Sequence, residues 1–362
     1  MINAISLFTG AGGLDTGFEK AGINIVVANE IDKYASATYK TNHPKTKLIV
    51  GNIEDKLDDI YKYSPQKLDL IIGGPPCQGF SVAGKMDPND PRSKMVWEYL
   101  SVVKHLRPNA FVIENVKALY KLKKWEPIKM KIISDANKMG YSCIPILLNS
   151  KDYDTPQKRE RVFFIGVKDH ELTSNILKFE FEKMEKKPEP LKQVLQSLGI
   201  AGSKMNPINS TAKITFATNP ILRKSPYSGM LFNGAGRPIN LDEYANTLPA
   251  SMGGNKTPII DNDALYKNKE NFVVDYHKKL KEGYKPVYQS APARLRRLTI
   301  KEAAAIQTFP KNYVFEGPMS SVYKQIGNAV PVNLATAVAK VVIKLLSDTS
   351  IYDSDPTTLK LF

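Results

Sequence analysis

Residues 4–15 read AISLFTGAGGLD, an apolar run that leads directly into a turn containing three glycines. An apolar run followed by such a turn is typical of a strand-to-helix connection in an α/β protein. Glycines at this turn let the backbone approach a ligand closely. The spacing departs from G-x-G-x-x-G, because Asp15 stands where the third glycine belongs. The turn therefore favours a nucleotide-like cofactor, and a plain tight turn is the alternative.

Similar apolar runs recur along the first half of the chain and alternate with helical patterns. Seven of them are expected to be strands: 4–8, 25–28, 47–50, 68–72, 111–113, 144–148 and 162–167. This alternation predicts an α/β fold. A polar loop, with no long helix, separates the last two runs, so we expect these two strands to pair antiparallel.

The pattern changes after residue 168, and the charged, proline-containing segment 183–190 is predicted to be a linker. Residues 190–241 contain six Lys and Arg but no Asp or Glu, and residues 181–300 hold 19 Lys and Arg against 10 Asp and Glu. Pro331 and the apolar spacing after it predict a helix that covers the first domain's sheet. We therefore expect the second domain to be inserted into the first.

Composition narrows the possible classes of protein. The 362 residues carry a net charge of +15, which favours a polyanionic partner. The two cysteines and four scattered histidines indicate neither a disulfide framework nor a metal site. The amino terminus does not resemble a secretory signal and no long uncharged apolar run stands out, so we expect a cytoplasmic protein without a membrane span.

Two further residues are candidates for ligand binding or catalysis. Glu30 ends the second apolar run, twenty positions after Gly10, where a carboxylate can accept from both hydroxyls of a ribose. NAD and S-adenosyl methionine would suit it equally. The segment GGPPCQGFS, residues 73–81, follows the fourth run and places Cys77 at the ligand-binding edge of the predicted sheet. The alternatives for Cys77 are a nucleophile and an incidental thiol on a rigid loop.

Several motifs together resemble the cytosine-C5 DNA methyltransferase family. In chain order they are FxGxGG at 8–13, PPCQGFS at 75–81, ENV at 114–116, QxRxR at 157–161 and QIGNAVP at 325–331. Residues 297–310 also resemble the family segment that closes the second domain. The resemblance implies a Rossmann-like, S-adenosyl methionine-dependent methyltransferase sheet with a smaller inserted DNA target-recognition domain, in an enzyme of the prokaryotic restriction-modification type.

The resemblance also implies domain limits. We expect the catalytic and cofactor-binding domain at 1–182, the target-recognition domain at 183–310, a return to the catalytic domain at 311–350, and a tail at 351–362.

The implied reaction is DNA (cytosine-5)-methylation of a flipped base. Carbon 5 of cytosine is a poor nucleophile, so Cys77 would add to carbon 6 and activate the ring. Glu114 would share a proton with N3 and bind the exocyclic amine. Side chains two apart on a strand point the same way, so Arg159 and Arg161 could both face the site. The resemblance implies that Arg161 binds O2 and that Arg159 supports the loop and a nearby phosphate.

The cofactor would be S-adenosyl-L-methionine, leaving as S-adenosyl-L-homocysteine. The residues expected to contact it are Phe8, Gly10, Gly12, Gly13, Leu14, Glu30, Ile31, Asn52, Ile53, Pro75, Asn328 and Val330. Two of them depart from the family. Asn52 stands where aspartate is common and can still accept from the adenine amine, without the charge. Ile31 stands where many relatives have an aromatic ring.

The implied partner is double-stranded DNA, with a cognate restriction endonuclease acting separately and the enzyme itself a monomer. Gln78 would enter the space vacated by the flipped base, and Ser81 and Thr247 would contact phosphates. Arg237 lies in the Gly- and Asn-rich segment 232–237, whose glycines are expected to permit close approach to the grooves. Arg237 could read guanine or contact phosphate.

Three other functions compete with this one. A related tRNA cytosine methyltransferase shares the motifs, a nicotinamide-dependent oxidoreductase fits the glycine turn and Glu30, and a catalytically inactive DNA-binding protein fits the charge. The large basic second domain favours duplex DNA over RNA, and the oxidoreductase leaves Cys77, Glu114 and Arg161 without a role. The target sequence and the base that removes the carbon 5 proton cannot be read from the chain.

Overall fold

The computed structural model describes residues 1–76, 94–348 and 350–353. The chain divides into two compact units. Unit 1 comprises Met1–Asp154, Arg159–Lys187 and Val330–Phe362, and unit 2 comprises Thr155–Lys158 and Pro188–Ala329. The chain therefore enters unit 2 briefly at Thr155–Lys158, returns to unit 1, leaves it again at Pro188 and comes back at Val330.

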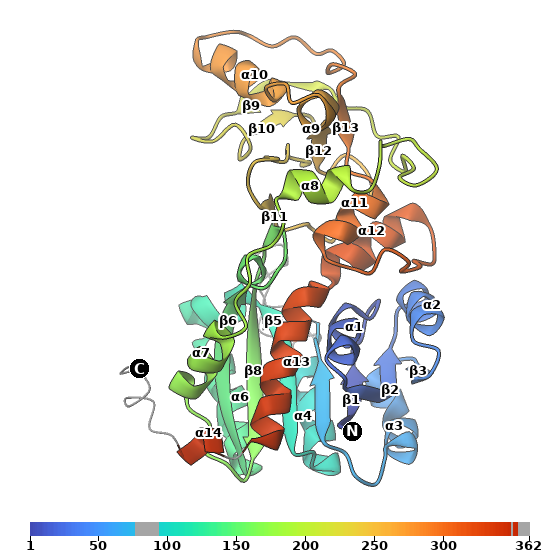
Figure 1. Cartoon of the computed structure of the whole chain (residues 1–362), viewed down its shortest axis with the longest axis vertical. Coiled ribbons are helices and arrows are strands. Elements are labelled where there is room, and N and C mark those ends of the chain that lie inside the picture. Colours follow the sequence, from blue (N-terminus) through green and yellow to red (C-terminus); the bar gives the residue numbers. More distant parts are fainter. Residues whose placement is uncertain (77–93, 349, 354–362) are drawn as a thin grey trace. The chain divides into compact units, whose positions relative to one another are not determined.

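A seven-stranded sheet with the order β3-β2-β1-β4-β5-β8-β6 forms the centre of unit 1 (Figure 1). Its strands are β1 (Asn3–Leu7), β2 (Asn24–Glu30), β3 (Lys47–Val50), β4 (Leu70–Gly73), β5 (Ala110–Val116), β6 (Tyr141–Asn149) and β8 (Glu160–Lys168). β1 to β5 pair in parallel, whereas β8 is antiparallel to both of its neighbours. The α/β fold and the expected antiparallel pairing of the last two strands are confirmed.

Helices cover both faces of this sheet (Figure 1). One face packs against α1 (Gly13–Lys20), α7 (Ser174–Glu182) and α13 (Val332–Ser347), and the other against α3 (Leu57–Tyr63), α4 (Met95–Leu106), α5 (Lys117–Lys121) and α6 (Glu126–Lys138). Successive strand residues serve opposite faces, because side chains alternate along a strand. Leu70 and Ile72 join the first layer, and Ile71 joins the second.

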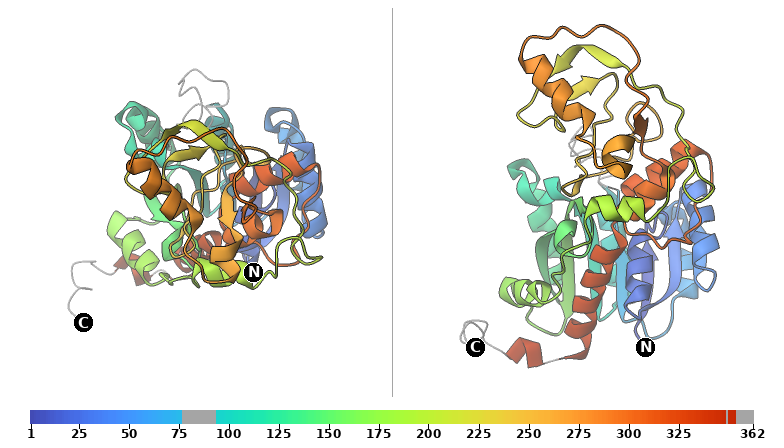
Figure 2. Two further views of the ribbon diagram at one scale, coloured as in Figure 1. Left: turned by 90° about the horizontal axis from the view of Figure 1, so that it is seen from above. Right: turned by 45° about the horizontal axis from the view of Figure 1, so that its top comes forward.

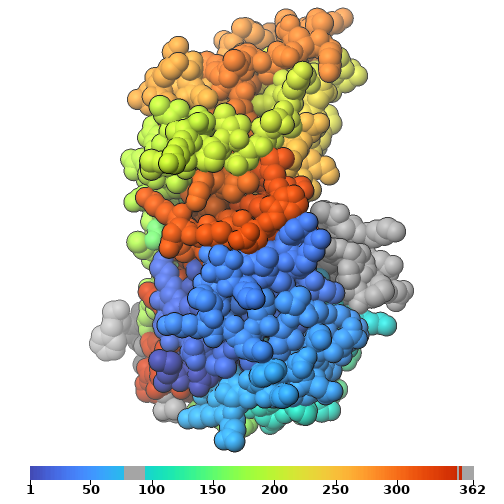
Figure 3. All heavy atoms as spheres, turned by 90° about the vertical axis from the view of Figure 1, so that its right-hand side faces the viewer, coloured from blue at the N-terminus to red at the C-terminus, as the bar shows by residue number. Residues whose placement is uncertain are grey.

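Short elements complete unit 1. They are α2 (Lys33–Asn42), α14 (Ser350–Asp353) and the 3-10 turns η1 (Ile53–Lys56), η3 (Lys123–Trp125) and η4 (Ser150–Asp152). The edge strand β3 is followed in the chain by η1 and α3 and contacts α2. These segments form one continuous side of unit 1, coloured in shades of blue in Figure 3. Helices flanking an edge strand limit its pairing with other chains.

The expected helix after Pro331 is α13, and its apolar residues are buried in unit 1. Within the described residues, Met319–Ser347 is the one helical segment long and apolar enough to cross a membrane. However, 67% of its most apolar window is buried inside the protein. The apolar length of α13 is thus explained by packing against the sheet and α1.

Unit 2 is built from short paired strands and helices. The antiparallel pairs are β9 (Phe216–Ile221) with β10 (Met230–Phe232) and β12 (Ile259–Asp261) with β13 (Leu295–Arg297), and β7 (Gln157–Lys158) pairs in parallel with β11 (Ala245–Asn246). The helices are α8 (Leu191–Gln196), α9 (Asn262–Tyr266), α10 (Phe272–Lys281), α11 (Ile300–Ile306) and α12 (Met319–Asn328). α10 lies against the β9–β10 hairpin (Figure 2), where Phe216, Phe232 and Tyr276 form a buried cluster.

The return to unit 1 occurs at Val330, whereas the sequence analysis places it at residue 311. The reason is that α11 and α12 pack with each other. Gln307 Nε2, just after α11, donates to the Ile326 carbonyl of α12 over 2.6 Å. Tyr323 Oη donates to the Leu298 carbonyl over 2.5 Å. These bonds hold both helices in unit 2.

We predict that Gly17→Ala lowers the free energy of unfolding by about 1 to 3 kcal/mol, the usual effect of overpacking. An added Cβ at Gly17 of α1 would lie 2.4 Å from Ala335 Cβ and 2.6 Å from the Val332 carbonyl oxygen of α13. Gly254→Ala is the control, because its Cβ would meet nothing within 4 Å. Urea unfolding of both variants tests this. Equal free energies of unfolding for Gly17→Ala and Gly254→Ala would show that α1 and α13 can move apart at little cost.

Candidate active site

The glycine turn joins β1 to α1 through three residues with positive φ. Phe8, Gly10 and Gly12 have φ values of 56°, 58° and 82°, and Gly12 is the N-cap of α1. Positive φ is accessible to glycine at little cost. A Cβ added at Gly10 would meet no described residue within 4 Å, so the described part of the chain leaves open space beside the turn. The backbone of the turn is therefore accessible to a ligand from that side.

Glu30, at the carboxyl end of β2, holds this turn in place. Its Oε2 accepts from Gly10 N over 2.7 Å, and its Oε1 accepts from the backbone N–H groups of Ile31 and Asp32 over 2.9 and 2.7 Å. Burial raises the pKa of the Glu30 carboxyl, and the three backbone hydrogen bonds oppose that rise. Oε1 already accepts two hydrogen bonds, whereas Oε2 accepts one and has a second acceptor position. Glu30 can therefore support the turn and still accept from a ligand.

Asp15, which replaces the third glycine, is completely buried under the turn. Its Oδ1 accepts from Tyr39 Oη over 3.0 Å, which ties α1 to α2. Burial raises the pKa of the Asp15 carboxyl, with the charge of His43 and nearby hydroxyls opposing the rise. The departure from the dinucleotide motif therefore has a structural explanation.

The residues expected at the adenine lie after β2 and β3. Ile31 is 65% exposed, which is unusual for a large apolar side chain beside a core strand. Ile53 is buried, and Asn52 Nδ2 donates to Glu54 Oε2 over 3.1 Å. The buried Asn29, missed by the sequence analysis, donates from Nδ2 to the carbonyls of Ile49 and Gly51 and so ties the ends of β2 and β3 together.

The fourth strand ends beside β1 and β5. A Cβ at Gly73 would lie 2.4 Å from the Leu7 carbonyl oxygen, and one at Gly74 would lie 2.9 Å from Glu114 Oε2. Glycine is thus needed where these strand ends meet. Cys77, Gln78 and Ser81 lie outside the described residues.

Glu114 and Arg161 form an ion pair at this edge of the sheet. Arg161 Nε lies 2.8 Å from Glu114 Oε1, and the two side chains are only 13% and 12% exposed. Burial raises the pKa of the Glu114 carboxyl, while the charges of Arg161 and then Arg159 act in the opposite direction. A carboxyl in this environment is suited to sharing a proton with a bound ligand. Arg159 is almost fully buried, which favours a supporting position.

Asn115 connects β5 to the segment that leads to Cys77. Its Nδ2 donates to the Pro75 carbonyl over 3.3 Å, and its Oδ1 accepts from Val116 N over 2.9 Å. The side chain is buried. Asn115 belongs to the ENV motif at 114–116, which by itself predicts no role for this side chain. The contact spans forty positions in the chain, so local pattern could not show it.

The remaining expected residues are placed as follows. Thr247 is exposed, and its Oγ1 donates to the Lys158 carbonyl over 2.8 Å within unit 2, so that hydroxyl hydrogen is already used. Asn328 is the last residue of α12 in unit 2, and Val330 is buried in unit 1. Arg237 is an exposed residue of unit 2.

Cys143, the second cysteine, lies in the core of unit 1. Cys143 is buried in β6, and burial raises the pKa of its thiol to about 12, so it is a core residue. Among the described residues, no group of three or more His, Cys, Asp or Glu could hold a metal ion.

The chain is similar to known DNA methyltransferases over nearly its whole length. Residues 2–344 match the model of the C-5 cytosine-specific DNA methylase family. The chain is 37% identical over 354 residues to the Type II methyltransferase M.FnuDI of Fusobacterium nucleatum, with 95% of each chain covered. It is 36% identical over 349 residues to the Type II methyltransferase M.NgoPII of Neisseria gonorrhoeae, covering 94% of this chain and 95% of that protein.

Two solved structures share the fold. One is a putative DNA modification methyltransferase encoded within an E. coli prophage, with a TM-score of 0.66, 22% identity, and coverage of 96% of this chain and 100% of that one. The other is the S. pombe Dnmt2 methyltransferase, with a TM-score of 0.62, 17% identity, and coverage of 96% and 98%.

We predict that Asn115→Ala lowers the free energy of unfolding by about 1 to 3 kcal/mol, because the Pro75 carbonyl and Val116 N–H lose a buried partner. Amide exchange at Val116 should also become faster. The control is Asn52→Ala, which removes a solvent-exposed contact with Glu54 and should cost no more than about 0.5 kcal/mol. Similar losses in the two variants would show that the Asn115 bridge contributes little.

Proposed function

Because the chain belongs to the C-5 cytosine-specific DNA methylase family, we propose that it methylates carbon 5 of a target cytosine in duplex DNA with Cys77 as covalent nucleophile. The observation that carries the proposal is the buried Glu114–Arg161 pair beside Gly74, three residues before Cys77. A buried carboxyl and a guanidinium beside Gly74, with a cysteine three positions further along the chain, match the chemistry that cytosine needs.

The reaction begins with a cytosine that has left the base stack, because carbons 5 and 6 are inaccessible within a duplex. The Cys77 thiolate adds to carbon 6, and the electron pair of the 5,6 double bond moves toward carbon 5 and N3. Glu114 shares its proton with N3 and accepts from the exocyclic amine. Its raised pKa supports this role, because a protonated carboxyl can donate. Arg161 binds O2, and the buried Arg159 supports the loop and a nearby phosphate.

Carbon 5 then accepts the methyl group. Loss of the carbon 5 proton and departure of the Cys77 thiolate restore the aromatic ring. S-adenosyl methionine is the methyl donor that we propose, since it supplies an electrophilic methyl group when bound. The open space at Gly10, the Glu30 carboxylate and the exposed Ile31 fit its methionine, ribose and adenine parts respectively.

Unit 2 is proposed to recognise the DNA target. Its basic surplus supports this role, and so does the exposed Arg237. The named relatives are Type II methyltransferases, which supports a restriction-modification enzyme with a separately acting endonuclease. Contacts of DNA with Gln78, Ser81 and Thr247, a monomeric state and a cytoplasmic location stay predictions.

We predict that a duplex with 5-fluorocytosine at the target forms a covalent adduct with the enzyme, because fluorine cannot leave as the proton does. Cys77→Ala should form no adduct and transfer no tritiated methyl group from labelled S-adenosyl methionine, while still binding DNA. Denaturing gels and scintillation counting measure the two effects. Substantial methyl transfer by Cys77→Ala would overturn the mechanism.

For the cofactor, Glu30→Ala should weaken binding of S-adenosyl methionine. Each charge-assisted bond to the ribose contributes roughly 1.5 to 3 kcal/mol. Titration calorimetry measures the dissociation constant, and thermal melting of the same sample shows whether the turn remains folded. A lower melting temperature with an unchanged dissociation constant would leave Glu30 with only its structural role.

A further inference from the structure

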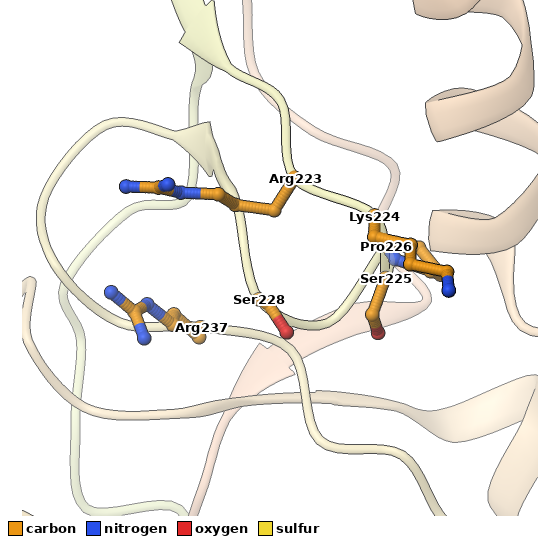
Figure 4. Close-up of a pocket in the computed structure, with 6 residues that line it drawn as sticks. All are labelled: Arg223, Lys224, Ser225, Pro226, Ser228 and Arg237. Carbon is orange, nitrogen blue, oxygen red and sulfur yellow. The ribbon is translucent and has the colours of Figure 1, made fainter.

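Unit 2 contains an open hollow of about 750 Å³ whose polar side chains are all hydrogen-bond donors (Figure 4). Its lining consists of three cationic side chains, two hydroxyls and a proline: Arg223, Lys224, Arg237, Ser225, Ser228 and Pro226. None of the lining residues is acidic. Guanidinium and ammonium groups donate only, and a hydroxyl can donate, so the hollow is suited to an anionic ligand.

The backbone of Arg223 is held firmly. Arg223 lies in the loop that joins β9 to β10, and its carbonyl accepts from His277 Nε2 of α10 over 2.9 Å. His277 is buried. Within the same loop, Ser228 N donates to the Ser225 carbonyl over 3.2 Å. One bond to the buried His277 and one bond within the loop therefore shape it, while the Arg223 side chain is exposed.

Arg237 is anchored from a different segment. Gly236 N donates to the Asn255 carbonyl over 3.0 Å, and the Arg237 carbonyl accepts from Ile259 N over 2.9 Å. A Cβ at Gly236 would lie 2.2 Å from the Thr257 carbonyl oxygen, and one at Gly234 would lie 2.6 Å from the Asn255 carbonyl oxygen. These glycines thus permit close approach to the protein's own backbone, where the sequence analysis expected approach to DNA.

The two guanidinium groups extend toward the same side of the hollow, whereas the Lys224 side chain extends to the opposite side (Figure 4). Both arginines are exposed. In the part of the chain that the structure describes, neither is within salt-bridge distance of a carboxylate, although many other cations of the protein are. Two unpaired charges on fixed backbone segments are therefore directed at one region of solvent.

We propose that Arg223 and Arg237 together bind the phosphate backbone of duplex DNA. Precise reading of a base edge is favoured by a side chain whose orientation is held by packing or by supporting hydrogen bonds. Neither guanidinium has such support among the described residues, and phosphate binding tolerates this freedom because it needs charge more than an exact orientation. The inference rests on the proposed function, since it takes DNA as the substrate.

The test measures the affinity of Arg223→Ala and Arg237→Ala for duplex DNA at several salt concentrations. The duplexes are the target found by bisulfite sequencing, its single-base variants and an unrelated sequence. We expect each variant to lose about five- to tenfold in affinity at low salt for every duplex alike. The dependence of log affinity on log salt should become shallower by about 0.9 for each phosphate contact removed.

Two controls make the result specific. Lys224→Ala removes one charge from the same loop but from a side chain that points away, so its loss should be clearly smaller. Arg223→Lys and Arg237→Lys keep the charge and should stay within about threefold of the wild type, whereas a bidentate contact with guanine would not tolerate lysine.

The proposal is overturned by an unchanged affinity, by an equal loss in Lys224→Ala, or by a loss that is confined to duplexes keeping one particular base pair of the target and is not restored by lysine. The last result would mean that an arginine reads a base. Failure of the proposed function is distinguishable, because it would appear as absence of methyl transfer by the wild-type enzyme.

Discussion

The shared direction of β1, β2, β4 and β5 is the constraint on which the rest of unit 1 depends. Parallel strands place their carboxyl ends at one edge of a sheet, where ligands bind in α/β proteins. The glycine turn and the segment ending at Pro75 follow such ends, Glu30 is the last residue of β2, and Glu114 lies near the end of β5. At their closest point, β1 and β4 leave no room for a Cβ at Gly73. Residues far apart in the chain meet because of this geometry.

The two carboxyls at that edge are stabilised differently, and the difference matches their proposed roles. Glu30 accepts three backbone N–H groups, which fixes it as an acceptor beside the turn. Glu114 instead faces Arg161, with Arg159 contributing more distant charge. Burial raises the pKa of both carboxyls. Only Glu114 lies beside the segment that leads to the thiol, where a transferable proton is useful.

Unit 2 shows that a count of positive charges does not by itself locate a binding surface. Arg296 and Arg297 are buried. Arg296 makes a two-pronged contact with Glu302, with nitrogen-to-oxygen distances of 2.8 and 2.6 Å, and Arg297 Nη1 donates to the Thr257 carbonyl. These arginines hold the domain together. Arg223 and Arg237 are instead exposed and directed at solvent. Buried arginines of unit 2 thus stabilise its fold, whereas exposed ones are available to bind a ligand.

The sequence by itself determined what depends on neighbouring residues. The seven strands, the antiparallel final pair, the helix after Pro331 and the family are all readable from apolar spacing, glycine turns and ordered motifs. Only the tertiary structure decided the features that need residues far apart in the chain. They are the Asn115–Pro75 hydrogen bond, the Asn29 contacts, the unit boundary at Val330 and the close packing at Gly234 and Gly236. The physical reason is that a hydrogen bond or a close backbone approach has two partners, and local pattern shows only one of them.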